Sequence, residues 1–177
     1  MDFRLSEAIF TNDTPTFMSL VQDNQEILEQ KTVKTLNTAL HFATRFGQVE
    51  LVKIIVELRP DMVAAVNGEL ETPLHEACKQ GNAEVVILLL EANPLASFKL
   101  NHKSQSALFM ASSYGHLHLV KLLLNTPKLL DLEDKGVDQT SLHVATARGH
   151  TDIVREILNV RPNFASRTDK NGYSTLH

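Results

Sequence analysis

The sequence predicts an all-α solenoid, a linear stack of helix pairs. A motif of the form Thr/Ser-x-Leu-His/Phe recurs every 34 residues, and a glycine follows nine residues after each complete copy starts. A fixed period of this length is typical of repeats that bury their apolar faces only against their neighbours. The motif begins at Thr38, Thr72, Ser106, Thr140 and Ser174.

We therefore expect residues 1–177 to form a single array. Its first repeat is degenerate and caps the stack, four repeats are regular, and a fifth copy of the motif begins a repeat that is cut short. A terminal repeat must turn one face to water, which explains why the first departs from the pattern. The predicted boundaries are 2–37 for the cap, 38–71, 72–105, 106–139 and 140–173 for the regular repeats, and 174–177 for the truncated one.

Each regular repeat is predicted to hold two helices. In the first repeat these cover about 39–46 and about 49–58, and the second carries its apolar residues at the spacing of one helical face. Small alanines allow adjacent first helices to approach closely, and prolines in register end the second helices. The third repeat should end differently, because its proline comes one residue early. These residues are Ala43, Ala77, Ala111 and Ala145, then Pro60, Pro94 and Pro162, with Pro127 as the exception.

The degenerate first repeat has its own helix signal. Thr14 followed by Pro15 is typical of an N-cap and a first helical position. An apolar stripe follows, formed by Phe17, Met18, Leu20, Val21, Ile27 and Leu28.

A period of 34 residues also fits tetratricopeptide repeats, which have two longer helices and an early aromatic residue. The chain has no tryptophan, and its helix pairs are entered by Thr-Pro-Leu-His and by Gly-(Gln/Asn/His). These features resemble the ankyrin repeat, over 38–173 in full and over 2–37 in part. The resemblance implies a curved, right-handed stack with projecting hairpins and a concave groove that binds another protein.

Composition excludes several other functions. The formal net charge is −4 with no cluster of Lys and Arg, so nucleic acid is not expected as a partner. The single cysteine, Cys78, excludes an internal disulfide and favours the reducing cytosol. The longest aliphatic run, 85–90, is far shorter than the roughly 20 residues that cross a bilayer. We expect a cytoplasmic segment without membrane contact.

The histidines are expected to be structural. His41, His75, His143 and His177 stand fourth in the motif, where the ring can bond the motif hydroxyl and hold neighbouring repeats in register. His116 and His150 follow the loop glycine. His116 and His118 are two residues apart, which on a helix directs them away from each other. Four acidic residues, Asp131, Glu133, Asp134 and Asp138, lack the alternating pattern of a calcium loop. No metal and no cofactor are predicted.

No catalytic residue is predicted either. Cys78 adjoins Ala77 inside a first helix, which favours a buried thiol over a nucleophile. The run Ser112–Gly115 lacks the leading glycine of a nucleophile elbow, and no glycine-rich loop could cradle a phosphate. The sequence indicates a binding module rather than an enzyme.

The resemblance implies that hairpin tips and the solvent side of the first helices line the groove. Phe46 and Tyr114 are the expected anchors, since exposed aromatic residues beside Arg and Lys often contribute about 2 kcal/mol or more. The alternative is that Phe46 merely packs on its neighbouring hairpin. The predicted protein-binding residues are Arg45, Phe46, Glu69, Glu71, Lys79, Gln80, Lys103, Gln105, Ser113, Tyr114, Gln139 and Arg148.

The motif that begins at Ser106 lacks both the proline and the histidine, because it reads Ser-Ala-Leu-Phe. The tie between hydroxyl and imidazole is therefore missing in the middle of the array. We expect a weaker seam there, with faster hydrogen exchange in 101–115 than in 67–81.

The opening Leu-x-Glu-Ala and the repeat endings Arg-Pro-Asp-Met and Arg-Pro-Asn-Phe resemble plant ankyrin proteins of the accelerated-cell-death type. That resemblance implies a longer signalling protein in stress and defence, with a C-terminal membrane domain at the plasma membrane and this array facing the cytosol. The alternative is an array that recruits substrate for an enzyme encoded beyond residue 177, such as an acyltransferase, a kinase or a ubiquitin ligase.

Overall fold

The computed structural model describes residues 1–126, 129, 139–166, 168 and 174. These residues belong to two compact units, Met1–Ala96 and Ser97–His177. The described residues are mainly helical, and outside the helices there is one isolated antiparallel bridge, between Thr168 and Ser174. The all-α prediction is confirmed.

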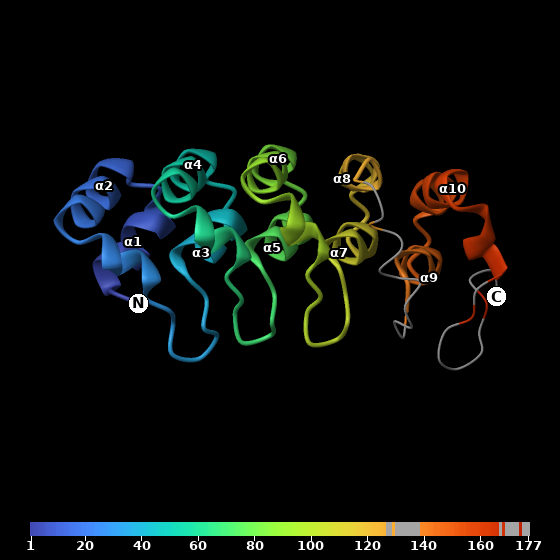
Figure 1. Ribbon diagram of the computed structural model, residues 1–177, viewed down its shortest axis with the longest axis horizontal. Coiled ribbons are helices and arrows are strands. Elements are labelled where there is room, and N and C mark those ends of the chain that lie inside the picture. The colour runs from blue at the N-terminus through green and yellow to red at the C-terminus, as the bar shows by residue number, and fades with distance from the viewer. Residues whose placement is uncertain (127–128, 130–138, 167, 169–173, 175–177) are drawn as a thin grey trace. The chain divides into compact units, whose positions relative to one another are not determined.

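In the N-terminal unit, three helix pairs stack side by side. The first helices of the pairs form one row and the second helices form another, and the loops between pairs extend beyond the row of first helices (Figure 1). The first-row helices are α1 (Phe3–Thr11), α3 (Ala39–Arg45) and α5 (Pro73–Gln80); the second-row helices are α2 (Thr14–Asp23), α4 (Val49–Leu58) and α6 (Ala83–Ala92).

The C-terminal unit repeats this arrangement with two pairs. First helix packs on first helix and second on second. Their bounds are α7 (Ala107–Ser113), α8 (Leu117–Leu124), α9 (Ser141–Ala147) and α10 (Thr151–Val160). The alanines at 43, 77, 111 and 145 are fully buried, as their predicted role at the contact between first helices requires.

The prolines after the second helices do more than end them. Pro60, Pro94 and Pro162 each start a short 3-10 helix and a further one follows α2, and the sequence analysis missed all four. These are η1 (Gln25–Glu29), which has no proline, then η2 (Pro60–Ala64), η3 (Pro94–Phe98) and η5 (Pro162–Ser166). The predicted ends at Pro60, Pro94 and Pro162 are confirmed, whereas Pro127, residues 131–138 and His177 lie outside the described residues.

The motif caps the first helices, and the predicted bond between its hydroxyl and its imidazole is present. Thr38 Oγ1 lies 2.9 Å from His41 Nδ1, and the corresponding distance is 2.9 Å for His75 and 2.8 Å for His143. The backbone N–H of Thr38 also donates to His41 Nδ1, so Nδ1 is an acceptor and the proton is on Nε2. That Nε2–H donates to the carbonyl oxygen of Glu71, the last residue before the next motif, at 2.9 Å. The predicted tie between repeats is confirmed at His41.

The deviant motif keeps half of this arrangement. Ser106 Oγ accepts a hydrogen bond of 3.1 Å from the backbone N–H of Phe109, so the N-cap remains. Phe109 is buried where the other repeats have an imidazole and cannot make the second bond. The predicted loss of the imidazole tie is confirmed.

The loop glycines are favoured by backbone geometry, and Gly47 and Gly115 also by contact. Gly115 has a φ of +79°, in the left-handed region that favours glycine. A Cβ at this position would lie 2.8 Å from Cε1 of His150, the N-cap residue of α10. His150 Nε2 lies 3.3 Å from the carbonyl oxygen of Ser113. Asn82 approaches Gly47 in the same way in the N-terminal unit.

The first repeat departs from the prediction at one position. Asp13, not Thr14, is the N-cap of α2, and its carboxylate accepts bonds from both the backbone N–H and the hydroxyl of Thr16. A carboxylate can accept both bonds at once, which a threonine hydroxyl at residue 14 could not do from inside the helix. Asn12, with a φ of +56°, ends α1 in place of the missing glycine.

The projecting loops are held by asparagines. Asn67 Oδ1 accepts from the N–H groups of Glu69 and Glu71, and its Nδ2 donates to Asn37 Oδ1 of the previous loop at 2.9 Å. Leu70 has a φ of +57° and is 49% exposed, which is an unfavourable backbone conformation for leucine.

Candidate functional site

An open apolar groove lies in the N-terminal unit between α1 and α3. Four phenylalanines, Phe3 and Phe10 of α1 and Phe42 and Phe46 of α3 and its C-cap, line a volume of about 420 Å³ together with Ser6 and Glu7. We call this the phenylalanine groove. Its large apolar residues are unusually exposed, at 78% for Phe3, 71% for Phe10 and 44% for Phe46.

The groove follows from the two faces of α1. Leu5, Ala8 and Ile9 are buried and hold the helix on the core. The lining residues stand at i, i+3, i+4 and i+7 in the order Phe3, Ser6, Glu7 and Phe10, so they share another face. An amphipathic helix normally presents polar residues there. Here two phenylalanines flank the polar pair.

The rings contact one another across the two helices. The Phe10 and Phe46 centroids are 5.5 Å apart in an edge-to-face arrangement, and those of Phe42 and Phe46 are 6.3 Å apart and stacked. Both arrangements are favourable for aromatic pairs. Phe46 therefore packs on α1 and on its own helix, and keeps nearly half of its surface exposed.

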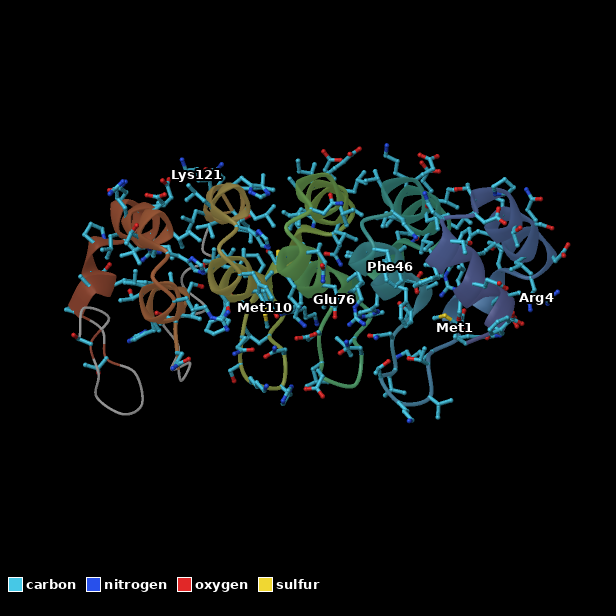
Figure 2. The ribbon with its side chains drawn as sticks, turned by 180° about the vertical axis from the view of Figure 1, so that it is seen from behind. Met1, Arg4, Phe46, Glu76, Met110 and Lys121 are labelled. Atoms are coloured by element: carbon cyan, nitrogen blue, oxygen red, sulfur yellow. The ribbon has the colours of Figure 1, made fainter. Side chains whose placement is uncertain are left out.

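The groove adjoins a cluster of charges on α3 and α5; Figure 2 labels Phe46 and Glu76 on these neighbouring helices. Arg45 donates to both carboxylate oxygens of Glu76, with distances of 2.9 and 3.3 Å. Glu76 is 2% exposed, and Lys79 lies 3.7 Å from it while also binding Glu71. Two cations and two carboxylates thus balance one another.

This pairing sets the ionisation of Glu76. Burial on its own would raise the pKa of the carboxyl group, but the hydrogen bonds from Arg45 and the charge of Lys79 outweigh it, so the pKa lies below its usual value. The charge is structural, since it joins α3 to α5.

Glu7 is different. It is exposed, it is the one charged residue in the lining of the groove, and none of the ion pairs found in the described part of the chain includes it. Arg4, the basic residue nearest to Glu7 in the sequence, lies 3.7 Å from Asp2.

The C-terminal unit carries a second aromatic position. Tyr114, the C-cap residue of α7, is 52% exposed, its ring stacks with His116 at 6.5 Å, and the guanidinium of Arg148 lies 5.9 Å from the ring centroid. Such a cation–π contact holds both side chains in place. The His116 and His118 rings are 6.1 Å apart, so the prediction that they point away from each other is wrong. His116 is the N-cap of α8 and not a residue within the helix.

The predicted binding residues divide into exposed and buried sets. Glu71 and Ser113 are 7% and 5% exposed, so placing their side chains on the solvent side was wrong; Glu71 is covered by its bond to Lys79. Lys79 and Gln105 are half-buried. The remaining residues are exposed, namely Arg45, Phe46, Glu69 and Gln80 in the N-terminal unit and Lys103, Tyr114, Gln139 and Arg148 in the C-terminal unit.

Sequence reasoning missed Phe3, Glu7, Phe10 and Phe42. The signal was present in the spacing of Phe3 and Phe10, seven residues apart on the face opposite Leu5 and Ile9. This spacing lies in the degenerate repeat, which lacks the motif that aligns the other repeats, so its residues could not be matched to positions in them.

The described ranges hold no candidate metal site. No group of three or more His, Cys, Asp or Glu residues there is arranged to hold a metal ion. Cys78 is a free thiol, fully buried as predicted, and burial raises its pKa. Across the same residues, every helix is too short or too polar to cross a membrane.

The comparison with family models matches nearly the whole chain. Residues 5–98, 61–130 and 108–177 each match the model described as ankyrin repeats (3 copies). No curated protein matches the chain.

Proposed function

Because the chain belongs to the ankyrin-repeat family, we propose that it is a protein–protein interaction module whose contact surface in the N-terminal unit is centred on the phenylalanine groove. The observation that carries the proposal is the exposure of three phenylalanine rings around one hollow. Soluble proteins rarely leave such a cluster in water unless it is used for contact.

The groove has the properties of a contact site. Burial of an exposed phenylalanine yields about 1.5–3 kcal/mol, so the rings of Phe3 and Phe10 offer a large gain to a partner. The ring of Phe46 is already oriented by Phe10 and Phe42, so little rotamer freedom is lost on binding. The groove is therefore partly pre-organised.

The neighbouring exposed residues extend this surface. In the N-terminal unit we include Arg45, Glu69, Gln80 and the half-buried Lys79. In the C-terminal unit we propose Tyr114, held by Arg148, as a second anchor, with Lys103, Gln105 and Gln139 around it. Glu71 and Ser113 are left out because their side chains are buried.

The test is a binding experiment with short random peptides displayed on phage and selected on the full chain. Peptides selected on the wild type should lose about tenfold or more in affinity for a Phe10→Ser, Phe46→Ser variant, as expected when two anchors are removed. A Phe46→Ala, Tyr114→Ala variant asks whether both units contribute. Urea unfolding shows whether each variant remains folded.

The matched control is Ile87→Ser, which removes a side chain that is 40% exposed on α6, away from the groove. Its affinity should equal that of the wild type. Peptides that bind the Phe10→Ser, Phe46→Ser variant as tightly as the wild type would show that the groove is not the contact site.

For the parent protein we propose, on the sequence resemblance alone, a signalling protein of plant defence or stress with a membrane domain, and a cytoplasmic location for this array. The free thiol of Cys78 suits a reducing compartment. That residues 1–177 form a single array stays a prediction, and no observation favours an attached enzyme. Reading the coding sequence beyond residue 177 tests the proposal, because the absence of apolar segments there would contradict it.

A further inference from the structure

We infer that the phenylalanine groove takes a peptide segment in which a lysine or arginine adjoins a bulky apolar side chain, with the cation paired to Glu7. This inference rests on the proposed function, since it names the partner of the same site.

The apolar half of the partner follows from the lining. Phe3, Phe10, Phe42 and Phe46 form the walls, and the volume of about 420 Å³ is near the lower end of the usual range for ligand pockets, about 300–1,000 Å³. A groove of this size accepts one or two side chains of a short segment. Bulky apolar side chains match walls made of aromatic rings.

The charged half follows from Glu7. Its carboxylate lies on the same helical face as Phe3 and Phe10 and between them in the sequence, so an occupant of the groove comes close to it. Once the occupant excludes water, a positive charge on the occupant next to Glu7 strengthens binding and a negative charge there weakens it. An arginine would in addition stack on the phenylalanine rings.

The cations near the groove are engaged elsewhere. Arg45 pairs with Glu76, Arg4 lies beside Asp2, and the amino group of Met1 donates to the carbonyl oxygen of Lys31 at 2.9 Å. The balanced pairs of α3 and α5 neither attract nor repel a charged partner strongly. Glu7 is therefore the residue that selects the sign of the partner.

The experiment compares peptides selected on two proteins. Random displayed peptides are selected on the full wild-type chain and, in parallel, on the Glu7→Lys variant. We expect the wild type to enrich peptides with a lysine or arginine beside a bulky apolar residue, and the variant to enrich a glutamate or aspartate in that place. A Glu57→Lys variant makes the same charge change at an exposed site on α4 and should enrich the same peptides as the wild type.

The affinities of selected peptides then measure the strength of the pair between Glu7 and the peptide cation. For the tightest basic peptide, Glu7→Gln should weaken binding about fivefold and Glu7→Lys about tenfold or more, and the loss should shrink at high salt. The corresponding peptide with glutamine in place of the cation should bind the wild type and Glu7→Gln equally.

The outcomes separate the two proposals. Binding that is lost in the Phe10→Ser, Phe46→Ser variant but shows no preference for a cation, or a preference for acidic peptides, overturns this inference and leaves the proposed function intact. Peptides insensitive to those phenylalanines overturn both. Concentration-dependent dimerisation that Phe10→Ser abolishes would identify a second copy as the occupant and overturn the inference as well.

Discussion

Arg45 and Glu76, 31 residues apart and in successive repeats, are joined by two hydrogen bonds between guanidinium and carboxylate. The Glu76 side chain is buried and the Arg45 side chain is 41% exposed, so the pair meets water through Arg45. Two parallel bonds from arginine fix both distance and orientation. The pair therefore sets how α3 lies on α5, and with it the position of Phe46 next to Arg45.

Arg45→Ala should destabilise the protein by about 1–3 kcal/mol, because the buried carboxylate of Glu76 loses its main partner. Urea unfolding measures the change. Adding Glu76→Gln to Arg45→Ala should recover part of the loss, because the unpaired charge is then gone. Additive effects of the two substitutions would show that the residues do not interact.

The same pair predicts a dependence on acid. The pKa of Glu76 is lower in the folded protein than its usual value of 4.5, so the stabilisation is complete above about pH 4.5 and is lost as the pH falls through the lower pKa of the folded state. The free energy of unfolding of Glu76→Gln should fall less steeply over that range than that of the wild type. Equal slopes would contradict the assignment.

Gly115→Ala and Gly149→Ala form a matched test of the loop glycines. Both positions have a φ near the left-handed region, so both substitutions should cost about 1 kcal/mol. Only at Gly115 would the new Cβ meet a side chain, that of His150, and disturb its bond to Ser113. Gly115→Ala should therefore cost about 1 kcal/mol more than Gly149→Ala in urea unfolding. Equal costs would show that the His150 contact has no energetic weight.

His41 should stay neutral in mildly acidic solution. Burial lowers the pKa of its ring below the usual 6.5, and the hydrogen bond to the Glu71 carbonyl offsets this only in part. As the pH falls, the unfolded chain binds a proton at His41 before the folded protein does. The contribution of neutral His41 to the free energy of unfolding is therefore complete above about pH 6.5 and is lost as the pH falls through the folded-state pKa. An NMR titration, assigned with His41→Gln, should give a midpoint below 6.5. A midpoint at or above 6.5 would refute the prediction.

Hydrogen exchange tests the deviant motif. Residues 101–115 should exchange faster than residues 67–81. The reason is that the Ser106 side chain makes one hydrogen bond to Phe109, whereas both the backbone N–H and the hydroxyl of Thr72 are bonded to the imidazole of His75. Phe109→His should slow the exchange in 101–115 by restoring an imidazole. Equal protection of the two segments in the wild type would dismiss the weaker seam.

Leu70→Asn should stabilise the protein by about 0.5–1 kcal/mol. A leucine at a φ of +57° is strained, whereas asparagine tolerates the left-handed region. Leu95→Asn, at a residue that is 70% exposed in a 3-10 helix, is the control for the loss of a surface leucine. If Leu70→Asn lowers the stability as Leu95→Asn does, the strain at Leu70 is negligible.

The regular repeats were predictable because their signals are local. The hydroxyl and imidazole of Thr72 and His75 cap a helix within four residues, and Gly81 ends it by its own backbone preference. The predicted second helix at about 49–58 agrees with α4 for the same reason, since its apolar spacing and its proline are both within one repeat.

What the sequence analysis missed depends on pairing over distance or on a residue's exact place at a helix end. Glu71 resembles any acidic loop residue until Lys79 of α5 covers it. Asp13 replaces Thr14 as the N-cap because its carboxylate holds two donors of Thr16. The phenylalanine groove needs α1 to lie against α3, and no pattern in the degenerate repeat specifies that contact.

The hydrogen bond from His41 ends on the backbone carbonyl of Glu71, not on its side chain. Every amino acid supplies that oxygen, so this joint between two repeats makes no demand on the identity of the residue at position 71. A substitution at position 71 that leaves the backbone in place therefore keeps the acceptor of His41 and removes only the side-chain pair with Lys79.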